Sequence, residues 1–199
     1  MIEAHLNSMP TEPAETPAQT TQLLDEHHLV MVADESGAAW RFTAQVGERL
    51  AAIAGASVVT IDGRRVESVE TFCDELAAGL GVRCHGRRFD TAVELLRSPP
   101  GAPRHQFFLW RDAERLVAAD PDLFGRLANA MLAVAAEKEH VSPERLVLQR
   151  SVFVGGARLE AYAGEDESRL RTWLVEDGAT PFWEVISSVP HPPVLTFRL

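Results

Sequence analysis

The chain has 199 residues, of which 46% are hydrophobic and 24% are charged, and its formal net charge is −10. This length and composition are typical of one globular domain, with or without additions, that buries a substantial core. No apolar run approaches the ~20 residues that cross a bilayer, and we expect neither a membrane segment nor a secretory signal. Two cysteines in such a chain indicate reduced thiols in a cytoplasm.

The acidity is concentrated near the beginning of the chain. Residues 1–26 contain five acidic residues and no Lys or Arg, which is half of the net charge, whereas 13 basic and 14 acidic residues leave 57–155 at −1. Binding to nucleic-acid phosphates needs a concentrated basic surface. We therefore expect no direct contact with nucleic acid.

The N-terminal part of the sequence predicts a tail, a hairpin and a helix. Residues 1–22 are polar and proline-rich, and such a segment does not bury enough apolar surface to order itself. Residues 29–32 and 39–42 are short β-rich runs separated by the turn signal at 34–37, which predicts a β-hairpin. Apolar spacing predicts a helix over 44–54.

Residues 57–154 contain three predicted strands joined by predicted helices. The strands are expected at 57–61, 106–110 and 146–154, and the helices at 68–80, within 84–96 and from Asp120 onward. The β-branched run 57–61 predicts a strand buried on both faces, and Phe107–Trp110 is expected in the core. Strands joined by helical crossovers lie parallel. The predicted fold class is α/β, a small three-stranded parallel sheet flanked by helices, with N- and C-terminal additions.

The C-terminal part predicts further elements around this central unit. Gly155 and Gly156 indicate a turn, after which Ala157–Tyr162 could return as a hairpin partner. A short helix is expected over 180–189 and a closing strand over 194–199. Phe182 and Trp183 either form an exposed patch for a partner or, as we expect, pack on the core. The predicted division is a disordered tail (1–22), an addition (23–56), the central domain (57–155) and a C-terminal addition (156–199).

The stretch from Cys84 to Leu96 carries the candidate site. We expect a tight turn at Gly86 followed by a short helix with one apolar stripe, made of Phe89, Ala92, Val93 and Leu96. Asp90 and Glu94 are four residues apart and share the other face of that helix. Two carboxylates at this spacing form either a solvated face or a paired anionic surface for a basic partner.

This stretch resembles the barstar family, the intracellular inhibitors of bacterial ribonucleases. The run Gly86-x-x-Phe89-Asp90-x-Ala92-x-Glu94-x-Leu96 is similar to the family signature Gly-x-Asn-Leu-Asp-Ala-Leu-x-Asp-x-Leu. The order of elements in 57–154 also resembles the family. The resemblance implies that this turn and helix plug a ribonuclease active site, with Asp90 and Glu94 in the place of substrate phosphates.

The resemblance also assigns the residues before the helix. Gly86 matches the loop glycine of the family, Cys84 and His85 fall where aromatic residues are frequent, and Arg88 falls where the family has Asn. The implied function is a bacterial immunity protein or antitoxin that binds a ribonuclease or related toxin. Its predicted partner-binding residues are Cys84, His85, Gly86, Arg87, Arg88, Asp90 and Glu94.

Two other classes of function stay open. Three arginines in the predicted loop (Arg83, Arg87, Arg88) and the additions at both ends favour an interaction module whose partner is not a ribonuclease. An enzyme could use Asp90 and Glu94 as general acid and base. Since the sequence shows no phosphate-binding loop, nucleophile elbow or metal-ligand spacing, we expect no enzyme, no cofactor and no metal.

Overall fold

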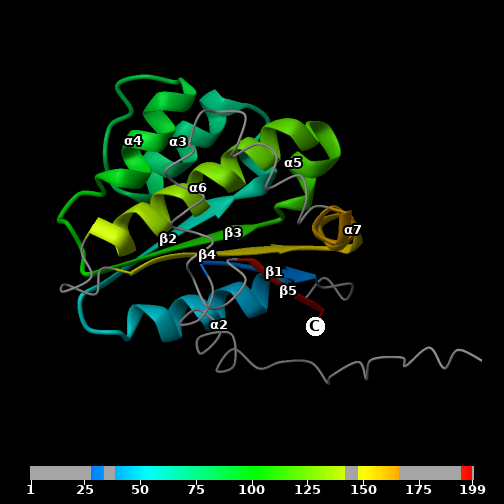
Figure 1. Ribbon diagram of the computed structural model, residues 1–199, viewed down its shortest axis with the longest axis horizontal. Helices are drawn as coiled ribbons and strands as arrows, with labels where there is room; N and C mark the ends of the chain where they lie inside the picture. Colours follow the sequence, from blue (N-terminus) through cyan, green and yellow to red (C-terminus); the bar gives the residue numbers. More distant parts are fainter. Residues whose placement is uncertain (1–27, 34–38, 142–147, 166–193, 199) are drawn as a thin grey trace, which may run out of the picture.

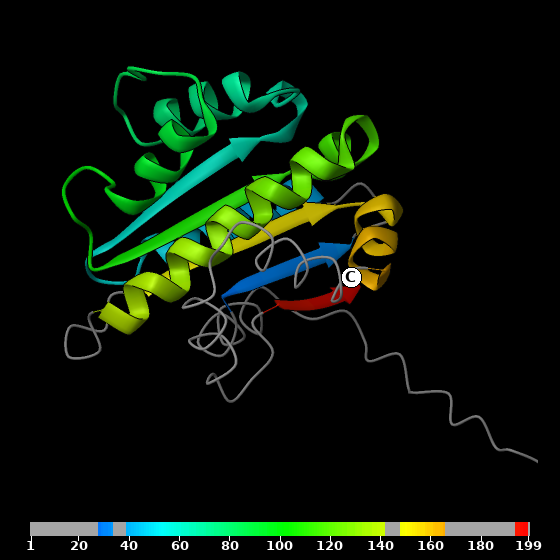
Figure 2. The ribbon, with the colours of Figure 1, turned by 45° about the horizontal axis from the view of Figure 1, so that its top comes forward.

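A five-stranded parallel sheet forms the centre of the protein. The computed structural model describes residues 28–33, 39–141, 148–165 and 194–198, and its strands are ordered β2-β3-β4-β1-β5 (Figures 1 and 2). The strands are β1 (Leu29–Ala33), β2 (Ala56–Asp62), β3 (His105–Arg111), β4 (Leu148–Gly155) and β5 (Val194–Arg198). The predicted α/β class is confirmed, and the three predicted central strands are neighbours in the sheet. β1 and β5 extend that sheet from three strands to five.

Helices cover both faces of the sheet. The helices are α2 (Ala39–Ala51), α3 (Val69–Gly79), α4 (Phe89–Arg97), α5 (Glu114–Ala119), α6 (Pro121–Val141) and α7 (Ala157–Glu165), and a 3₁₀ turn, η1, spans Gly63–Arg65. α2 lies on one face, and α3 to α6 lie on the other (Figure 1). The result is a three-layer α/β arrangement, as expected when helical crossovers join parallel strands.

The two-residue period of β3 divides the core into two clusters. Phe107 and Leu109 pack against Val46 and Leu50 of α2. Phe108 and Trp110 point the other way, into the larger cluster beneath α3 to α6. Because successive strand side chains alternate between faces, a fully apolar strand such as β3 fills both layers. The predicted core position of Phe107–Trp110 is confirmed.

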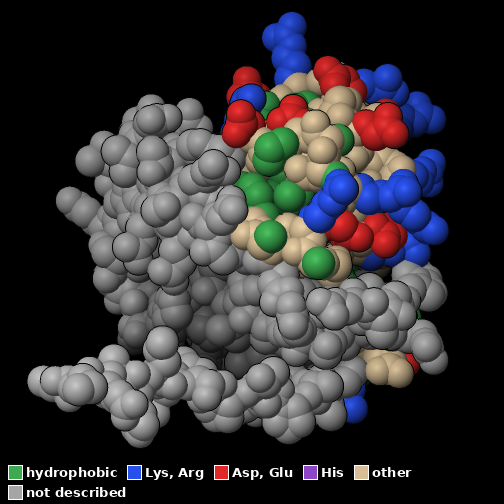
Figure 3. Space-filling model, turned by 90° about the vertical axis from the view of Figure 1, so that its right-hand side faces the viewer, with side chains coloured by type: hydrophobic (Ala, Val, Ile, Leu, Met, Phe, Trp, Pro, Cys, Tyr) green, Lys and Arg blue, Asp and Glu red, His purple; other side chains and the backbone are tan. Residues whose placement is uncertain are grey.

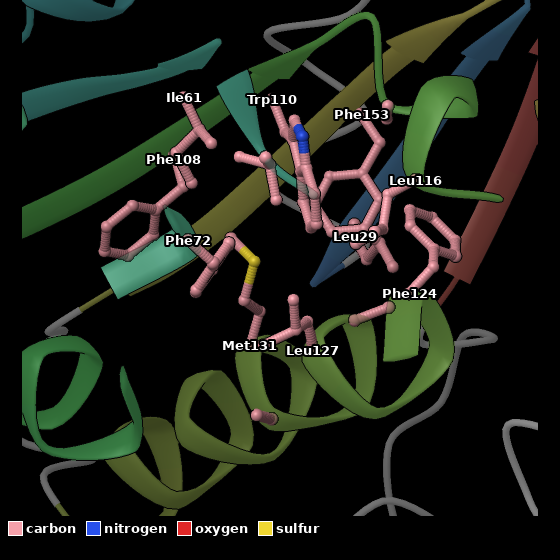
Figure 4. Close-up of a cluster of buried hydrophobic side chains, with 14 of the residues drawn as sticks. Leu29, Ile61, Phe72, Phe108, Trp110, Leu116, Phe124, Leu127, Met131 and Phe153 are labelled. Carbon is pink, nitrogen blue, oxygen red and sulfur yellow. The ribbon is translucent and has the colours of Figure 1, made fainter. Parts of the chain in front are cut away.

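Aromatic rings form the centre of the larger cluster. The ring of Trp110 lies 5.2 Å from that of Phe72, 5.5 Å from Phe124 and 5.1 Å from Phe153, measured between ring centroids (Figure 4). The ring of Tyr162 on α7 meets that of Phe124 on α6 edge-on at 5.0 Å. α7 therefore belongs to the same layer as α6.

Two predicted hairpins are wrong. Residues 39–42 begin helix α2 rather than a second strand, and residues 157–162 begin helix α7. β1 and β4 therefore lie parallel to each other, and each is followed by a helix in the chain. Short β-rich runs beside a turn signal are compatible with both outcomes, and long-range pairing of β1 with β4 decides between them.

β2 also differs from its prediction. It is an edge strand, with Val59 and Ile61 buried but Thr60 exposed. The β-branched run predicted a strand buried on both faces. The strand lies at the end of the sheet, so the face toward α2 is incompletely covered there.

Side-chain caps mark the helix starts that were expected at residue 68 and at Asp120. The Ser68 hydroxyl accepts a hydrogen bond from the Thr71 backbone at 3.3 Å, and the Asp120 carboxylate accepts one from the Leu123 backbone at 2.9 Å. The closing strand expected over 194–199 is β5. The tail 1–22 and the helix 180–189, with Phe182 and Trp183, lie outside the described residues.

Candidate functional site

The predicted carboxylates lie together on the outer side of α4. Asp90 and Glu94 are both exposed, while Ala92 and Leu96 are buried on the opposite side of the helix. The Ser98 hydroxyl lies 3.2 Å from Glu94 Oε1. Among the described residues, neither carboxylate forms an ion pair with an arginine. We call loop 82–88 together with this side of α4 the α4 face.

Three contacts fix α4 on the protein. Arg87 Nε donates to Asp74 Oδ1 of α3 at 3.1 Å, and Arg97 Nε donates to Glu137 Oε2 of α6 at 3.0 Å. The Arg126 guanidinium of α6 lies over the ring of Phe89, 4.8 Å from its centroid. These contacts act at both ends of a short helix, so the α4 face is held in place before any partner binds.

Gly86 has a different role from the one expected. Its φ is not in the left-handed region, and the turn that follows α3 uses Gly81 instead, with φ +68°. A methyl group on Gly86 would lie 2.7 Å from Thr91 Oγ1. Gly86 is therefore required for the close approach of the loop to the first turn of α4, not for a sharp backbone turn.

The other predicted loop residues divide into exposed and inward-facing groups. His85 and Arg88 are exposed, as is Arg87 apart from its bond to Asp74. Cys84 is half-buried against the core, and its thiol donates to the Gly86 carbonyl oxygen at 2.6 Å. His85, Arg87 and Arg88 are thus exposed on the loop that leads into the helix with the two carboxylates, whereas the Cys84 side chain faces the core.

A second group of charged side chains lies where β2 and β3 end, and no motif in the sequence predicted it. Arg64 donates to both oxygens of Asp62, at 3.0 and 2.9 Å, and Arg111 forms an ion pair with the same carboxylate. Arg64 and then Arg111 hold the pKa of Asp62 well below its usual range despite partial burial. Asp112 lies 3.5 Å from Arg64. Two acids and two arginines thus neutralise each other at this edge. Figure 3 shows acidic and basic side chains lying next to one another on one side of the molecule.

One carboxylate oxygen at this edge has no partner among the residues that the structure describes. Glu114 Oε2 is buried and accepts no hydrogen bond from them, and a methyl group on Gly155 at the end of β4 would overlap it. Gly155 is thus needed for the close approach of Glu114. The described residues contain no group of three or more potential metal ligands, so Glu114 belongs to no candidate metal site among them.

The order of the strands marks a further position of interest. After β1 the chain crosses to the α2 layer, and after its neighbour β4 it enters α7 in the other layer. In open parallel sheets, ligands bind outside the carboxyl ends of strands at such a switch point. Ala33 and Gly155 end the two strands here.

The sequence between β1 and α2 does not fit a bound nucleotide. Phosphate-binding loops have the pattern Gly-x-x-x-x-Gly-Lys-Ser/Thr between a strand and a helix. If Gly37 takes the second glycine position, Val32 replaces the first, and Ala38 and Ala39 replace the lysine and the hydroxyl residue. The groups that would bind phosphate and Mg²⁺ are thus missing from this pattern.

Comparisons with known proteins identify no family. No protein-family model matches the chain, and no curated protein matches it. Among solved structures, the Aeropyrum pernix ORC2 protein in ADPNP and ADP complexes is similar at 12% identity, over 90% of this chain, with a TM-score of 0.49. Drosophila ORC bound to DNA is similar at 12% identity over 92% of this chain, with a TM-score of 0.48. The chain spans 44% of the first structure's chain and 29% of the second's.

Among the described residues, no helix has the length and apolar character needed to span a bilayer.

Proposed function

We propose that this protein is an interaction module that binds a protein partner in the cytoplasm through the α4 face, without catalysing a reaction. The observation that carries this proposal is the pair of exposed carboxylates of Asp90 and Glu94 on a helix fixed at both ends. A fixed surface loses little conformational entropy when a partner binds.

The charges of the α4 face favour a partner with charges of both signs. Arg83, His85 and Arg88 are exposed in the loop before α4, and Asp90 and Glu94 are exposed on the helix itself. A surface with a basic loop and two acids would match a partner that offers an acidic and a basic patch. This mixed character supports a partner other than a ribonuclease.

A second candidate is the inhibitor or immunity protein implied by the resemblance to the barstar family. The observation that favours it is that neither Asp90 nor Glu94 is paired with an arginine of the described chain. Both carboxylates are therefore available to the basic groups of a ribonuclease or related toxin. The exposed arginines of the loop act against this candidate, since they would repel such an active site.

Both candidates require that a protein partner binds through Asp90 and Glu94, and affinity capture from the source cells tests this requirement. The bait is the full chain, the test variant is Asp90→Asn/Glu94→Gln, and the matched control is Glu48→Gln/Glu67→Gln, two exposed acids outside the α4 face. The loss of two charge-assisted contacts should weaken binding by about 100-fold in the test variant. Equal capture by all three baits would contradict the proposal.

The activity of the captured protein separates the two candidates. A ribonuclease whose activity falls when the wild-type chain is added, and not when Asp90→Asn/Glu94→Gln is added, would support the inhibitor. A captured partner without nuclease activity would support the general interaction module.

A further inference from the structure

The only two cysteines of the chain lie on either side of the loop that leads into α4. Cys73 is on α3 and fully buried, whereas Cys84 is half-buried at the start of the loop. Both thiols are free. Both pack against the larger core cluster, although 11 positions separate them in the sequence.

Both thiols hold the backbone of this loop. Cys84 Sγ donates to the Gly86 carbonyl oxygen at 2.6 Å, and Cys73 Sγ donates to the Arg88 carbonyl oxygen at 3.4 Å. Arg88 is the residue before α4 and provides no side-chain cap for the helix. The conformation of the loop before α4 thus depends on two S–H donors.

The two thiols also meet each other. Their sulfur atoms hold carbonyl groups only two residues apart, those of Gly86 and Arg88. Burial, and then interaction with Cys84, raises the pKa of Cys73 to about 11. Cys73 therefore stays protonated at neutral pH. Cys84, the more accessible of the two, is the thiol that an oxidant reaches first.

We propose that Cys73 and Cys84 are an oxidative modification site, which forms an internal disulfide and thereby rearranges loop 82–88. In the first step the Cys84 thiolate attacks a peroxide oxygen, which gives a sulfenic acid and releases water or an alcohol. In the second step the Cys73 thiol attacks the sulfenic sulfur and gives its proton to the departing hydroxide, so that water leaves and the disulfide forms. The two thiols are oxidised by two electrons, and the peroxide is reduced by two.

The disulfide removes both donors from the loop. The carbonyl oxygens of Gly86 and Arg88 lose their S–H partners, and a half-buried carbonyl without a partner destabilises the conformation that contains it. The loop must then adopt another conformation or reach solvent. If the proposed function is correct, oxidation also alters the surface that receives the partner.

Thiol counting in the full chain tests the bond itself, without any partner. Purified protein is exposed to hydrogen peroxide, unreacted thiols are alkylated, and tryptic peptides are examined without reduction. We expect both free thiols to disappear and a linked pair of peptides, 66–83 with 84–87, to appear in monomeric protein. Two persistent free thiols, or a disulfide found only between two copies of the chain, would overturn the proposal.

Amide hydrogen exchange tests the change in the loop. Amides of 84–97 should exchange about tenfold faster in the oxidised chain, while those of α2 stay unchanged. Cys84→Ser treated with the same peroxide is the control, because it retains any methionine oxidation without the disulfide. Cys84 is half-buried, so this variant retains the core that Cys73 completes. Equal exchange in the oxidised wild type and in the control would overturn the rearrangement.

Partner binding then separates this inference from the proposed function. Weaker binding after oxidation, restored by a dithiol reductant, is expected for the wild type and absent for Cys84→Ser. If the disulfide forms but the partner binds Asp90→Asn/Glu94→Gln as tightly as the wild type, the proposed function is contradicted and the disulfide is not. Unchanged binding by the oxidised chain, with a partner that does depend on the two carboxylates, would overturn the regulatory part of the inference.

Discussion

The imidazole Nε2 of His28, directly before β1, lies 2.8 Å from Oε2 of Glu139 near the end of α6. His28 is almost completely buried, as is Arg150 of β4, whose guanidinium lies 3.2 Å from the same carboxylate oxygen. One carboxylate thus joins the amino ends of two neighbouring strands to the helix that covers them. Replacing this carboxylate removes a charged partner from a buried guanidinium, which destabilises the fold.

Acid should weaken the protein through Glu139. Contact with His28, and then the charge of Arg150, lowers the pKa of Glu139 to about 2, from 4.5 in an unfolded chain. A carboxyl with a lowered pKa stabilises the folded state above its unfolded value and loses that effect as the pH falls from about 4.5 to 2. Glu139→Gln should therefore reduce the free energy of unfolding at pH 7 and much less at pH 3, in urea titrations at both values.

Glu137→Gln is the matched control for this prediction. Glu137 is on the same turn of α6 and is as exposed as Glu139, but its ion-pair partner Arg97, at 3.0 Å, is itself exposed. An exposed pair of this kind contributes roughly 0–1 kcal/mol. If Glu137→Gln and Glu139→Gln have the same effect at both pH values, the assigned role of Glu139 is wrong.

Lys138 should titrate far below an ordinary lysine. It is the only lysine of the chain, and its Nζ donates to the Leu96 carbonyl oxygen at 3.0 Å and to Gln149 Oε1 at 2.7 Å. Burial lowers its pKa to about 8, from 10.5. Competitive labelling with an amine reagent should give a midpoint of about pH 8 in the folded chain. A midpoint near 10.5, the value expected in urea, would contradict the burial argument.

The same shift predicts a rise in stability at alkaline pH. The folded chain releases the Lys138 proton at a lower pH than the unfolded chain does, so the unfolded state binds more protons between pH 8 and 10.5. The free energy of unfolding should rise over that interval. Lys138→Met should remove this rise, as measured by urea unfolding at pH 8 and pH 10.

Trp110 should tolerate phenylalanine better than its burial suggests. Its side chain is completely buried between the rings of Phe72, Phe124 and Phe153, and within the described part of the chain the indole N–H meets no hydrogen-bond acceptor. Trp110→Phe loses volume but removes an unpaired donor, so we expect a loss below about 1.5 kcal/mol. Trp110→Ala should cost about 3–5 kcal/mol. Equal losses for both variants in urea unfolding would contradict this account.

Gly63 should not accept a side chain, whereas Gly81 should accept one at modest cost. A methyl group on Gly63 would overlap the carbonyl oxygens of Arg111 and Asp112, which belong to the backbone at the end of β3. Gly63→Ala should therefore destabilise by more than about 2 kcal/mol. Gly81→Ala enters open space and loses only about 1–2 kcal/mol for its left-handed φ. Thermal unfolding of the two variants compares them directly.

The sequence alone determined the features that depend on near neighbours in the chain. The apolar run Phe107–Trp110 predicted a buried strand, and Ser68 and Asp120 predicted the helix starts that their side chains now cap. The stripe opposite Asp90 and Glu94 predicted which side of α4 is exposed. Each of these features depends on the two-residue period of a strand, on the three-to-four-residue spacing of a helix, or on a cap within one helical turn. All three can be recognised in the sequence alone.

Only the tertiary structure decided which strands pair, and therefore which residues far apart in the sequence become neighbours. The position of β1 between β4 and β5 made residues 39–42 part of a helix, and brought His28 to Glu139. The packing of α3 against the loop brought Cys73 to Cys84. Such contacts join residues far apart in the chain, and their energy depends on the whole assembled core, so no local pattern contains them.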